Sequence, residues 1–212
     1  MKTFRDFISE AKDPKSKTYH AFDIDETLFA HDHSKLKVHL KDKNTGERVG
    51  SLTNQEFNTH KLHPNHEYDF AEFKSSKTFQ QSAKPIGKMI AKLKAIHKNN
   101  KNVEMVTARQ DFDDKEALGH HFKKYGIDIG QVHVRRAGNV DPKAQPGPNK
   151  AKVISDQIQK NGYNKVHLYD DSQSNLDHFL ALKDKHPDVA FHAHLVQHDP
   201  KTDKVKITTT KA

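Results

Sequence analysis

The chain of 212 residues has no cysteine, no tryptophan and no long apolar run. Without cysteine it can form neither disulfides nor thiolate metal sites, which excludes small disulfide-bonded secreted scaffolds, zinc ribbons and thiol enzymes. No stretch approaches the roughly 18 apolar residues of a membrane span, and the N-terminal segment lacks the apolar run of a secretory signal. We therefore expect a soluble, cytoplasmic protein without a membrane partner.

Basic residues outnumber acidic ones, with 36 Lys and Arg against 28 Asp and Glu and a formal net charge of +8. This balance favours a polyanionic partner such as nucleic acid, although a lysine-rich surface is also a common route to solubility. The length fits one domain, and the modest content of Leu, Ile, Val and Phe predicts a thin core.

Short apolar segments alternate with segments of helical periodicity along most of the chain. The expected strands span 19–24, 103–106, 131–135, 166–169 and 189–196, and the expected helices span 83–96, 112–125, 149–161 and 176–182. This alternation predicts βαβ units, so we expect an α/β fold with a mainly parallel sheet of about five strands flanked by helices.

Three segments lie outside this pattern. Residues 1–18 form an N-terminal prefix or short helix, and residues 199–212 a polar C-terminal tail that we expect to be frayed. Residues 31–81 are a small insertion with one hairpin, because Asp42-Lys43-Asn44-Thr45-Gly46 separates two short apolar runs. The main domain therefore spans 19–198.

Polar residues follow three of the expected strands: Asp23 and Asp25 after the first, Thr107 after the second, and Asp170 and Asp171 after the fourth. Since ligands of parallel sheets bind beyond the carboxyl ends of the strands, these side chains should converge at one edge. Clustered carboxylates are costly without a cation, and an all-oxygen donor set favours Mg²⁺ over zinc. Asp23, Asp25, Asp170 and Asp171 are therefore the candidate Mg²⁺ ligands. Read alone, the pair Asp170-Asp171 would also suit an ordinary helix cap.

A magnesium site beside a hydroxyl group and a lysine is suited to phosphate. Thr107 and Lys150 fit these roles, and Lys150 stands at the start of an expected helix, where backbone N–H groups also favour an anion. Lys152 has a spacing that allows it the same role. Arg109 is either a further contact for a substrate phosphate or a solvent-facing loop residue.

Four segments resemble, in order and spacing, the four motifs of the haloacid dehalogenase (HAD) superfamily. They are Asp23-Ile24-Asp25-Glu26-Thr27-Leu28, Thr107, Lys150 and Asp170-Asp171-Ser172-Gln173-Ser174-Asn175. The first and last are specific and the other two are weak alone. The resemblance covers residues 19–196 and implies a Rossmann-like core with a small cap at 31–81.

The resemblance also implies a phosphatase mechanism. Asp23 would attack phosphorus and form an aspartyl-phosphate, and Asp25 would protonate the leaving oxygen and then activate water. Thr107 would hold a phosphoryl oxygen, and Lys150 would neutralise charge on Asp23 and in the transition state.

The same resemblance implies that the Asp23 carboxylate and the Asp25 backbone carbonyl bind Mg²⁺. Asp171 takes the usual metal-binding position, and Asp170 would bind directly or through water.

A small cap leaves the site open to a large substrate. Together with the net charge and with Arg135, Arg136 and Lys143 ahead of Lys150, this favours a nucleotide or polynucleotide phosphate as substrate. The arrangement is similar to the 3′-phosphatase half of polynucleotide kinase/phosphatase. The alternatives are a small-molecule phosphatase and a DNA-associated protein that uses the core as a binding scaffold. A scaffold would not need the catalytic acids. The oligomeric state stays open.

Residues 1–11 resemble the capsid-targeting prefix of internal head proteins of large tailed phages, with cleavage after Ile8-Ser9-Glu10. Under this interpretation the protein would be packaged in the virion and delivered to the host cytoplasm. An amphipathic helix packed on the domain is the alternative, since Phe4, Phe7 and Ile8 have helical spacing.

The 17 histidines include three spacings that resemble metal sites: His31-Asp32-His33, His63-x-x-His66 and His192-x-His194. So many histidines produce such spacings by chance. His31 and His33 are the stronger candidates, because they follow the acidic loop and would line a substrate entrance.

Overall fold

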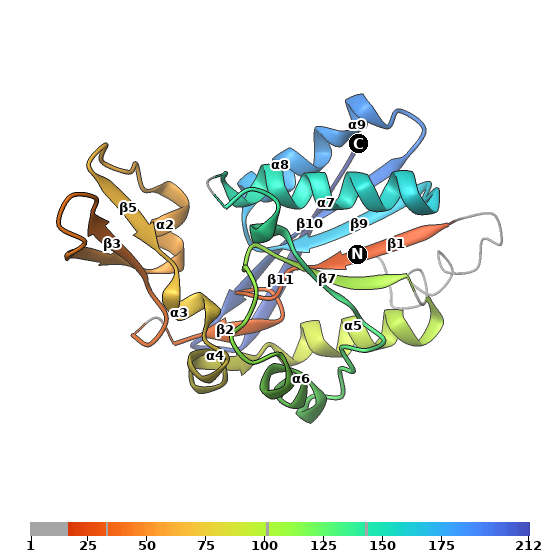
Figure 1. The fold of residues 1–212 in the computed structure, drawn as a ribbon. Coiled ribbons are helices and arrows are strands. Elements are labelled where there is room, and N and C mark those ends of the chain that lie inside the picture. Colours follow the sequence, from red (N-terminus) through yellow and green to blue (C-terminus); the bar gives the residue numbers. More distant parts are fainter. Residues whose placement is uncertain (1–16, 33, 101, 143) are drawn as a thin grey trace.

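A computed structural model describes residues 17–212 apart from 33, 101 and 143 (Figure 1). The predicted prefix lies almost entirely outside the described residues, so its cleavage and its phage-like role stay predictions. Among the described helices, none is both long and apolar enough to cross a membrane.

The centre of the molecule is a six-stranded sheet in which five strands are parallel and the edge strand is antiparallel. In sheet order the strands are β11 (Lys204–Lys211), β10 (Ala190–Asp199), β9 (Lys165–Asp170), β1 (Thr18–Phe22), β7 (Val103–Thr107) and β8 (Val134–Arg136). The predicted α/β class with a mostly parallel sheet is confirmed, and the sheet is mixed rather than all parallel.

Helices cover both faces of this sheet (Figure 1). They are α5 (Gly87–Asn99) and α6 (Lys115–Lys124) on one face, and α7 (Pro146–Asn161), α8 (Gln173–Leu180) and α9 (Leu182–Lys185) on the other. Side chains alternate along each strand, so Phe22 packs on the core beneath α5 while Ala21 packs on the core beneath α7.

Three helices begin at residues other than those predicted, each for a local reason. Helix α5 begins at Gly87, because Ala83–Pro85 forms strand β6 and pairs with β2 (Phe29–His31). Helix α7 begins at Pro146, because a proline in the first turn has no N–H that needs an intrahelical partner. Helix α6 begins at Lys115, since the Asp114 side chain accepts from Ala117 N–H and caps it.

The C-terminal segment is a strand, so the prediction of a frayed tail over 199–212 is wrong. Strand β11 pairs with β10 from His192↔Lys211 to Asp199↔Lys204. Val205 and Ile207, two positions apart, both pack against the core from this strand. Their alternation was the available sequence signal for a half-buried strand.

The insertion between β2 and β6 forms a lobe beside the sheet (Figure 1). The lobe contains β3 (Val38–Asp42), β4 (Arg48–Leu52), β5 (His66–Asp69), α2 (Asn54–Thr59) and α3 (Ala71–Lys74). The insertion then returns to the main domain as α4 (Ser76–Ser82), which packs beside α6 and places Phe79 in the main core. The predicted hairpin is present as β3 and β4, with Gly46 at φ 72° in its turn, and β5 adds a third strand. A small core of its own stabilises the lobe, around Leu36, Val38 and Phe73.

A row of histidines crosses the sheet on the face covered in part by α5. His20 of β1 stacks on His167 of β9, with ring centroids 4.5 Å apart. His167 Nδ1 lies 2.9 Å from His194 Nε2 of β10, and His194 Nδ1 lies 2.8 Å from Thr209 Oγ1 of β11. The three imidazoles are buried. They form one ladder across neighbouring strands.

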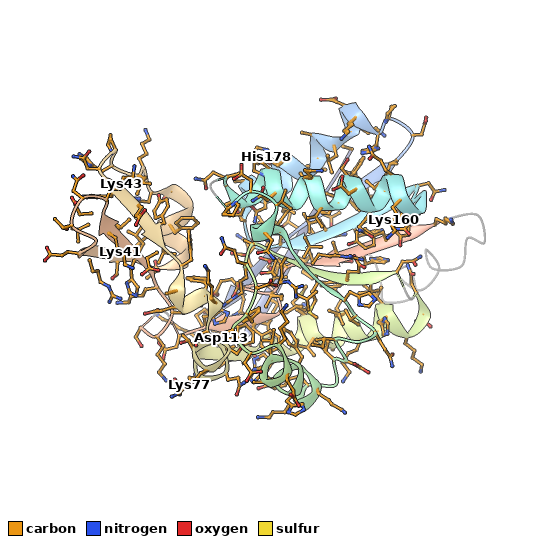
Figure 2. The ribbon with its side chains drawn as sticks, viewed as in Figure 1. Lys41, Lys43, Lys77, Asp113, Lys160 and His178 are labelled. Carbon is orange, nitrogen blue, oxygen red and sulfur yellow. The ribbon has the colours of Figure 1, made fainter. Side chains whose placement is uncertain are left out.

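Exposed lysines are spread over the molecule. Figure 2 places Lys41 and Lys43 on the insertion lobe, Lys77 on α4 and Lys160 on α7. The Lys41 side chain pairs with Asp69 at 2.8 Å. The positive charge counted in the sequence is therefore not confined to one part of the surface.

Candidate active site

The loop after β1 turns back tightly and fixes Asp23 and Asp25 at the carboxyl edge of the sheet. Asp23 N–H donates to Tyr169 O at 2.9 Å, which ties it to the end of β9. Ile24 O then accepts from both Leu28 N–H and Phe29 N–H. The acidic residues at the ends of β1 and β9 are thereby brought side by side, as the parallel topology predicts.

Lys150 is a buried cation at this edge of the sheet. Its Nζ lies 2.9 Å from Asp23 Oδ1 and 2.7 Å from Asp170 Oδ2, and 1% of its side chain is exposed. Lys152, the sequence alternative, is exposed and pairs with Asp156 of the same helix at 3.0 Å. The structure therefore brings Lys150 to the acidic residues and leaves Lys152 on the surface.

Three carboxylates cluster beside Lys150. Asp23, Asp170 and Asp171 each place an oxygen within 4.8 Å of the others, and in the described part of the chain they are the one such group of metal-ligand side chains. Burial raises the pKa of Asp23 to about 8, despite the opposing effect of Lys150. Burial and the neighbouring carboxylates raise the pKa of Asp171 well above its usual range.

The donor set fits a hard divalent cation. One ammonium faces three carboxylates, so the cluster keeps an excess of negative charge when all are ionised. The donors are all oxygen, the type that Mg²⁺ prefers. Asp170 is held in place from the other side, because its Oδ1 accepts from Asn175 Nδ2 at 2.9 Å and from Ser172 N–H at 3.0 Å. These residues could hold a metal.

The Asp25 carboxylate points to a different set of partners. Arg109 forms a two-pronged contact with it, from Nη2 to Oδ1 at 2.6 Å and from Nε to Oδ2 at 2.9 Å. His31 Nε2 lies 2.6 Å from Oδ1. Burial alone would raise the pKa of Asp25, but Arg109 and His31 hold it well below its usual range. The side chain of Asp25 is therefore not part of the acidic triad that could hold a metal.

Arg109 is buried rather than solvent-facing. Besides Asp25, its guanidinium donates to Phe73 O at 2.6 Å and lies over the Phe73 ring at 4.9 Å. The side chain borders the cleft, yet its N–H groups bind protein atoms. This contact links the acidic edge to the insertion lobe, a role that sequence reasoning missed, because Phe73 lies 36 residues away along the chain.

Thr107 ends β7 and is fully buried. Its Oγ1 accepts from Arg109 N–H at 3.1 Å, so the hydroxyl stabilises the turn that carries Arg109. That contact does not use the hydroxyl hydrogen.

The basic residues expected near Lys150 are engaged elsewhere. Arg135 pairs with Glu104 at 2.6 Å, and Arg136 pairs with Asp111 at 2.5 Å. Lys143 lies outside the described residues.

The candidate histidines lie in different parts of the molecule. His31 lies at the site, where its Nδ1 is 3.0 Å from Ser82 Oγ, a partner that nothing in the sequence indicated. His33 is not described. His63 and His66 have rings 4.9 Å apart in the insertion lobe. His192 and His194 belong to β10.

A cleft opens beside this edge, with about 880 Å³ of empty space that is partly open to solvent. The acidic edge forms one boundary. The insertion lobe and the segment before α7 form the others. The lining includes Asp23, Lys150, Asp171, Phe57, Phe70 and Pro142.

Gly138 allows the close approach that shapes one wall of the cleft. A Cβ atom at this position would lie 2.2 Å from Ala108 O and 2.9 Å from the Arg109 carbonyl carbon. A second close approach holds α7 against α8, since a Cβ at Gly147 would lie 2.4 Å from His178, which is labelled on α8 in Figure 2. Gly138 is required by space, because its neighbours are backbone atoms, whereas the His178 side chain beside Gly147 is exposed and could shift.

A scan of the chain against models of protein families finds no match, and searches of the curated proteins and of the solved structures find none either.

Proposed function

We propose that the protein is a Mg²⁺-dependent phosphomonoesterase of the HAD type that works through an aspartyl-phosphate on Asp23. The observation that carries the proposal is the buried contact of Lys150 with Asp23 inside an acidic triad that opens into a cleft. Perturbed carboxylates and a buried lysine at a cleft are typical of catalytic sites.

Asp23 is the nucleophile in this mechanism. One of its carboxylate oxygens bonds to phosphorus while the bond from phosphorus to the leaving oxygen breaks. The attack needs the ionised form, so the raised pKa of Asp23 must be lowered when the site is loaded. Lys150 contributes to this, because its ammonium contacts Asp23 directly. Its own pKa is raised by Asp170 and Asp23, against the effect of burial, so it stays protonated.

The acidic triad would hold the magnesium ion, which when bound supplies positive charge to the phosphoryl oxygens. The Thr107 hydroxyl is the candidate donor to a phosphoryl oxygen from the end of β7.

Asp25 serves the second step in the conformation described. Arg109 and His31 keep it ionised, which suits it to take a proton from the water that hydrolyses the aspartyl-phosphate. In the first step the leaving oxygen needs a proton. Protonated His31, whose Nε2 lies 2.6 Å from Asp25 Oδ1, would pass its proton to the Asp25 carboxylate, which donates it to the leaving oxygen.

The test is phosphate release from a nucleoside monophosphate, a 3′-phosphorylated oligonucleotide and ribose 5-phosphate, with Mg²⁺ or with EDTA. Asp23→Asn keeps the shape of the side chain and removes the nucleophile, so we expect the rate to fall about 10³-fold or more. Asp188→Asn, at an exposed position, is the matched control and should retain the wild-type rate.

Release that persists in Asp23→Asn would contradict the proposal. So would the absence of release from all three substrates by a folded protein supplied with Mg²⁺, a result that would favour the binding scaffold.

A further inference from the structure

We infer that the phosphate ester accepted by this cleft is that of a nucleoside, whose base lies against Phe57 and Phe70 of the insertion lobe. For the phosphate end of the ligand, the inference rests on the proposed function. For the base end, it rests on the walls of the cleft.

The two ends of the cleft differ in chemistry. Asp23, Asp171 and Lys150 provide the charged end. The insertion lobe provides an apolar end made of Val38, Phe57, Phe70 and Phe73. A ligand that fills the cleft must therefore carry a charged group at one end and an apolar surface at the other.

The aromatic residues of the apolar end are held rigidly. The rings of Phe57 and Phe70 meet edge to face at 5.4 Å, and Tyr68 packs on Phe57 in the same way at 4.9 Å. Both phenylalanines nevertheless remain partly exposed at the cleft. Fixed aromatic surface that stays open to a cleft is suited to stack a planar group.

The charged end and the apolar end of the cleft are joined by direct contacts. The Arg109 guanidinium contacts Asp25 on one side and the Phe73 ring and carbonyl on the other. The distance between the charged end and the aromatic end is thereby set by direct contacts. This arrangement positions an aromatic group relative to a phosphate that reacts at Asp23.

The remaining walls indicate a base rather than a plain hydrocarbon ring. Pro142 and Pro146 border the cleft from the segment around the start of α7, and Gln110, Asn149 and Lys74 add polar side chains. A nucleobase combines a flat π face with donors and acceptors at its edge, which matches apolar walls with polar groups between them.

The experiment compares a purine nucleoside monophosphate with ribose 5-phosphate, which lacks the base, by kcat/KM. Stacking of one base on an aromatic side chain predicts a preference of about 5- to 150-fold for the nucleotide. In Phe57→Ala this ratio should fall toward 1, chiefly through KM. Phe57→Leu keeps apolar packing without the π face and should reduce the ratio as well, which guards against a variant that does not fold. Val49→Ala, exposed on β4 of the same lobe, should keep the wild-type ratio.

Two further substrates identify the source of the base. A 3′-phosphorylated oligonucleotide with a higher kcat/KM than the mononucleotide would assign the cleft to a strand end, and the reverse ranking to a free nucleotide. A higher kcat/KM for benzyl phosphate, which is an alkyl ester like the nucleotides, than for either would overturn the inference in favour of a plain aromatic ring. Equal kcat/KM for the nucleotide and ribose 5-phosphate, or an unaltered ratio in both Phe57 variants, would overturn it too.

Binding separates this inference from the proposed function. If no substrate is hydrolysed, the proposed function fails, and titration calorimetry with the nucleoside monophosphate then decides the base site. Binding that weakens at least fivefold in Phe57→Ala supports the base site. Binding that is absent, or equal in both proteins, contradicts it.

Discussion

Strand β1 buries ionisable side chains in two contrasting ways. Asp23, just beyond its end, lies 2.9 Å from the Lys150 ammonium within a group of charged residues. His20, near the middle of the strand, stacks on His167 with ring centroids 4.5 Å apart. Burial, with a smaller contribution from Lys92, lowers the pKa of His20 to about 3. One group is buried beside an opposite charge and the other is buried neutral.

The comparison distinguishes buried polar residues that can act on a ligand from buried polar residues that only pack within the same sheet. A buried charge cluster is costly, and replacing such a cluster by apolar residues is often stabilising. Here the cluster borders the cleft, where its charge can act on a ligand. The histidine ladder carries no charge near neutral pH and packs as a set of aromatic rings. The following variants test this distinction, from the largest expected effect to the smallest.

Lys150→Met should have the largest effect on stability. It removes the cation between Asp23 and Asp170 and leaves two buried carboxylates facing each other. We expect the free energy of unfolding at pH 7.5 to fall by about 3–5 kcal/mol, as measured by urea denaturation. Added Mg²⁺ should recover part of the loss, because a divalent cation replaces the missing charge. A loss below about 1 kcal/mol would contradict the view of Lys150 as the counter-charge of the cluster.

Gly138→Ala tests whether the cleft wall must keep its shape. The new Cβ would meet the backbone of Ala108 and Arg109, which cannot retreat as a flexible side chain would. We expect a loss of about 1–3 kcal/mol in the free energy of unfolding, together with a lower kcat because Arg109 positions Asp25.

Gly87→Ala is the matched control for Gly138→Ala. A Cβ at Gly87 meets nothing within 4 Å, and the residue lies in α5, where alanine is the better helix former. Its stability should equal or exceed that of the wild type. If the two variants behave alike, the close contact at Gly138 is not the cause.

His20→Phe tests the neutral ladder through pH. An unfolded histidine binds a proton below pH 6.5, whereas the pKa of folded His20 is about 3, so His20 costs stability as the pH falls below 6.5. Phenylalanine keeps the ring and removes this cost. Between pH 7.5 and 5.5 the variant should therefore gain about 1.4 kcal/mol relative to the wild type.

Only the difference in the free energy of unfolding between His20→Phe and the wild type is diagnostic in this experiment. Burial raises the pKa of Asp23 to about 8 and that of Glu26 to about 7, so these groups favour the folded state as the pH falls and oppose the histidines in both proteins. A difference that does not vary between pH 7.5 and 5.5 would show that His20 is not buried neutral.

Lys152→Ala should have the smallest effect. Its exposed pair with Asp156 spans one helical turn, and such pairs contribute about 0.5 kcal/mol or less. Phosphate release should match the wild type. A loss comparable to that of Lys150→Met would reverse the assignment of the two lysines.

Local patterns in the sequence were sufficient to predict much of the core. The alternation of short apolar runs with helical periodicity predicted the α/β class and the parallel strands. The acidic residues after β1 and β9 were recognisable because parallel strands place their carboxyl ends at one edge. The hairpin of the insertion was predicted by its turn residues, among which Gly46 adopts the positive φ that the turn requires.

Other features depended on contacts between distant residues. Lys150 and Lys152 are only two positions apart on one helix, and the packing of α7 decided which of them is buried. The orientation of Asp25 depended on Arg109, 84 residues away. The third strand of the lobe and the Phe57–Phe70 pair depended on the way the insertion folds back on itself.

The sequence by itself thus determined the main strands and helices of the core and which edge of the sheet carries the acidic residues, because those properties follow from periodicity and from chain direction. The tertiary structure alone decided which side chains share a proton or a charge, and where the aromatic wall faces the acidic edge. These depend on distances of a few ångströms between segments, such as the 2.6 Å contact of Arg109 with Phe73 O, that no local pattern specifies.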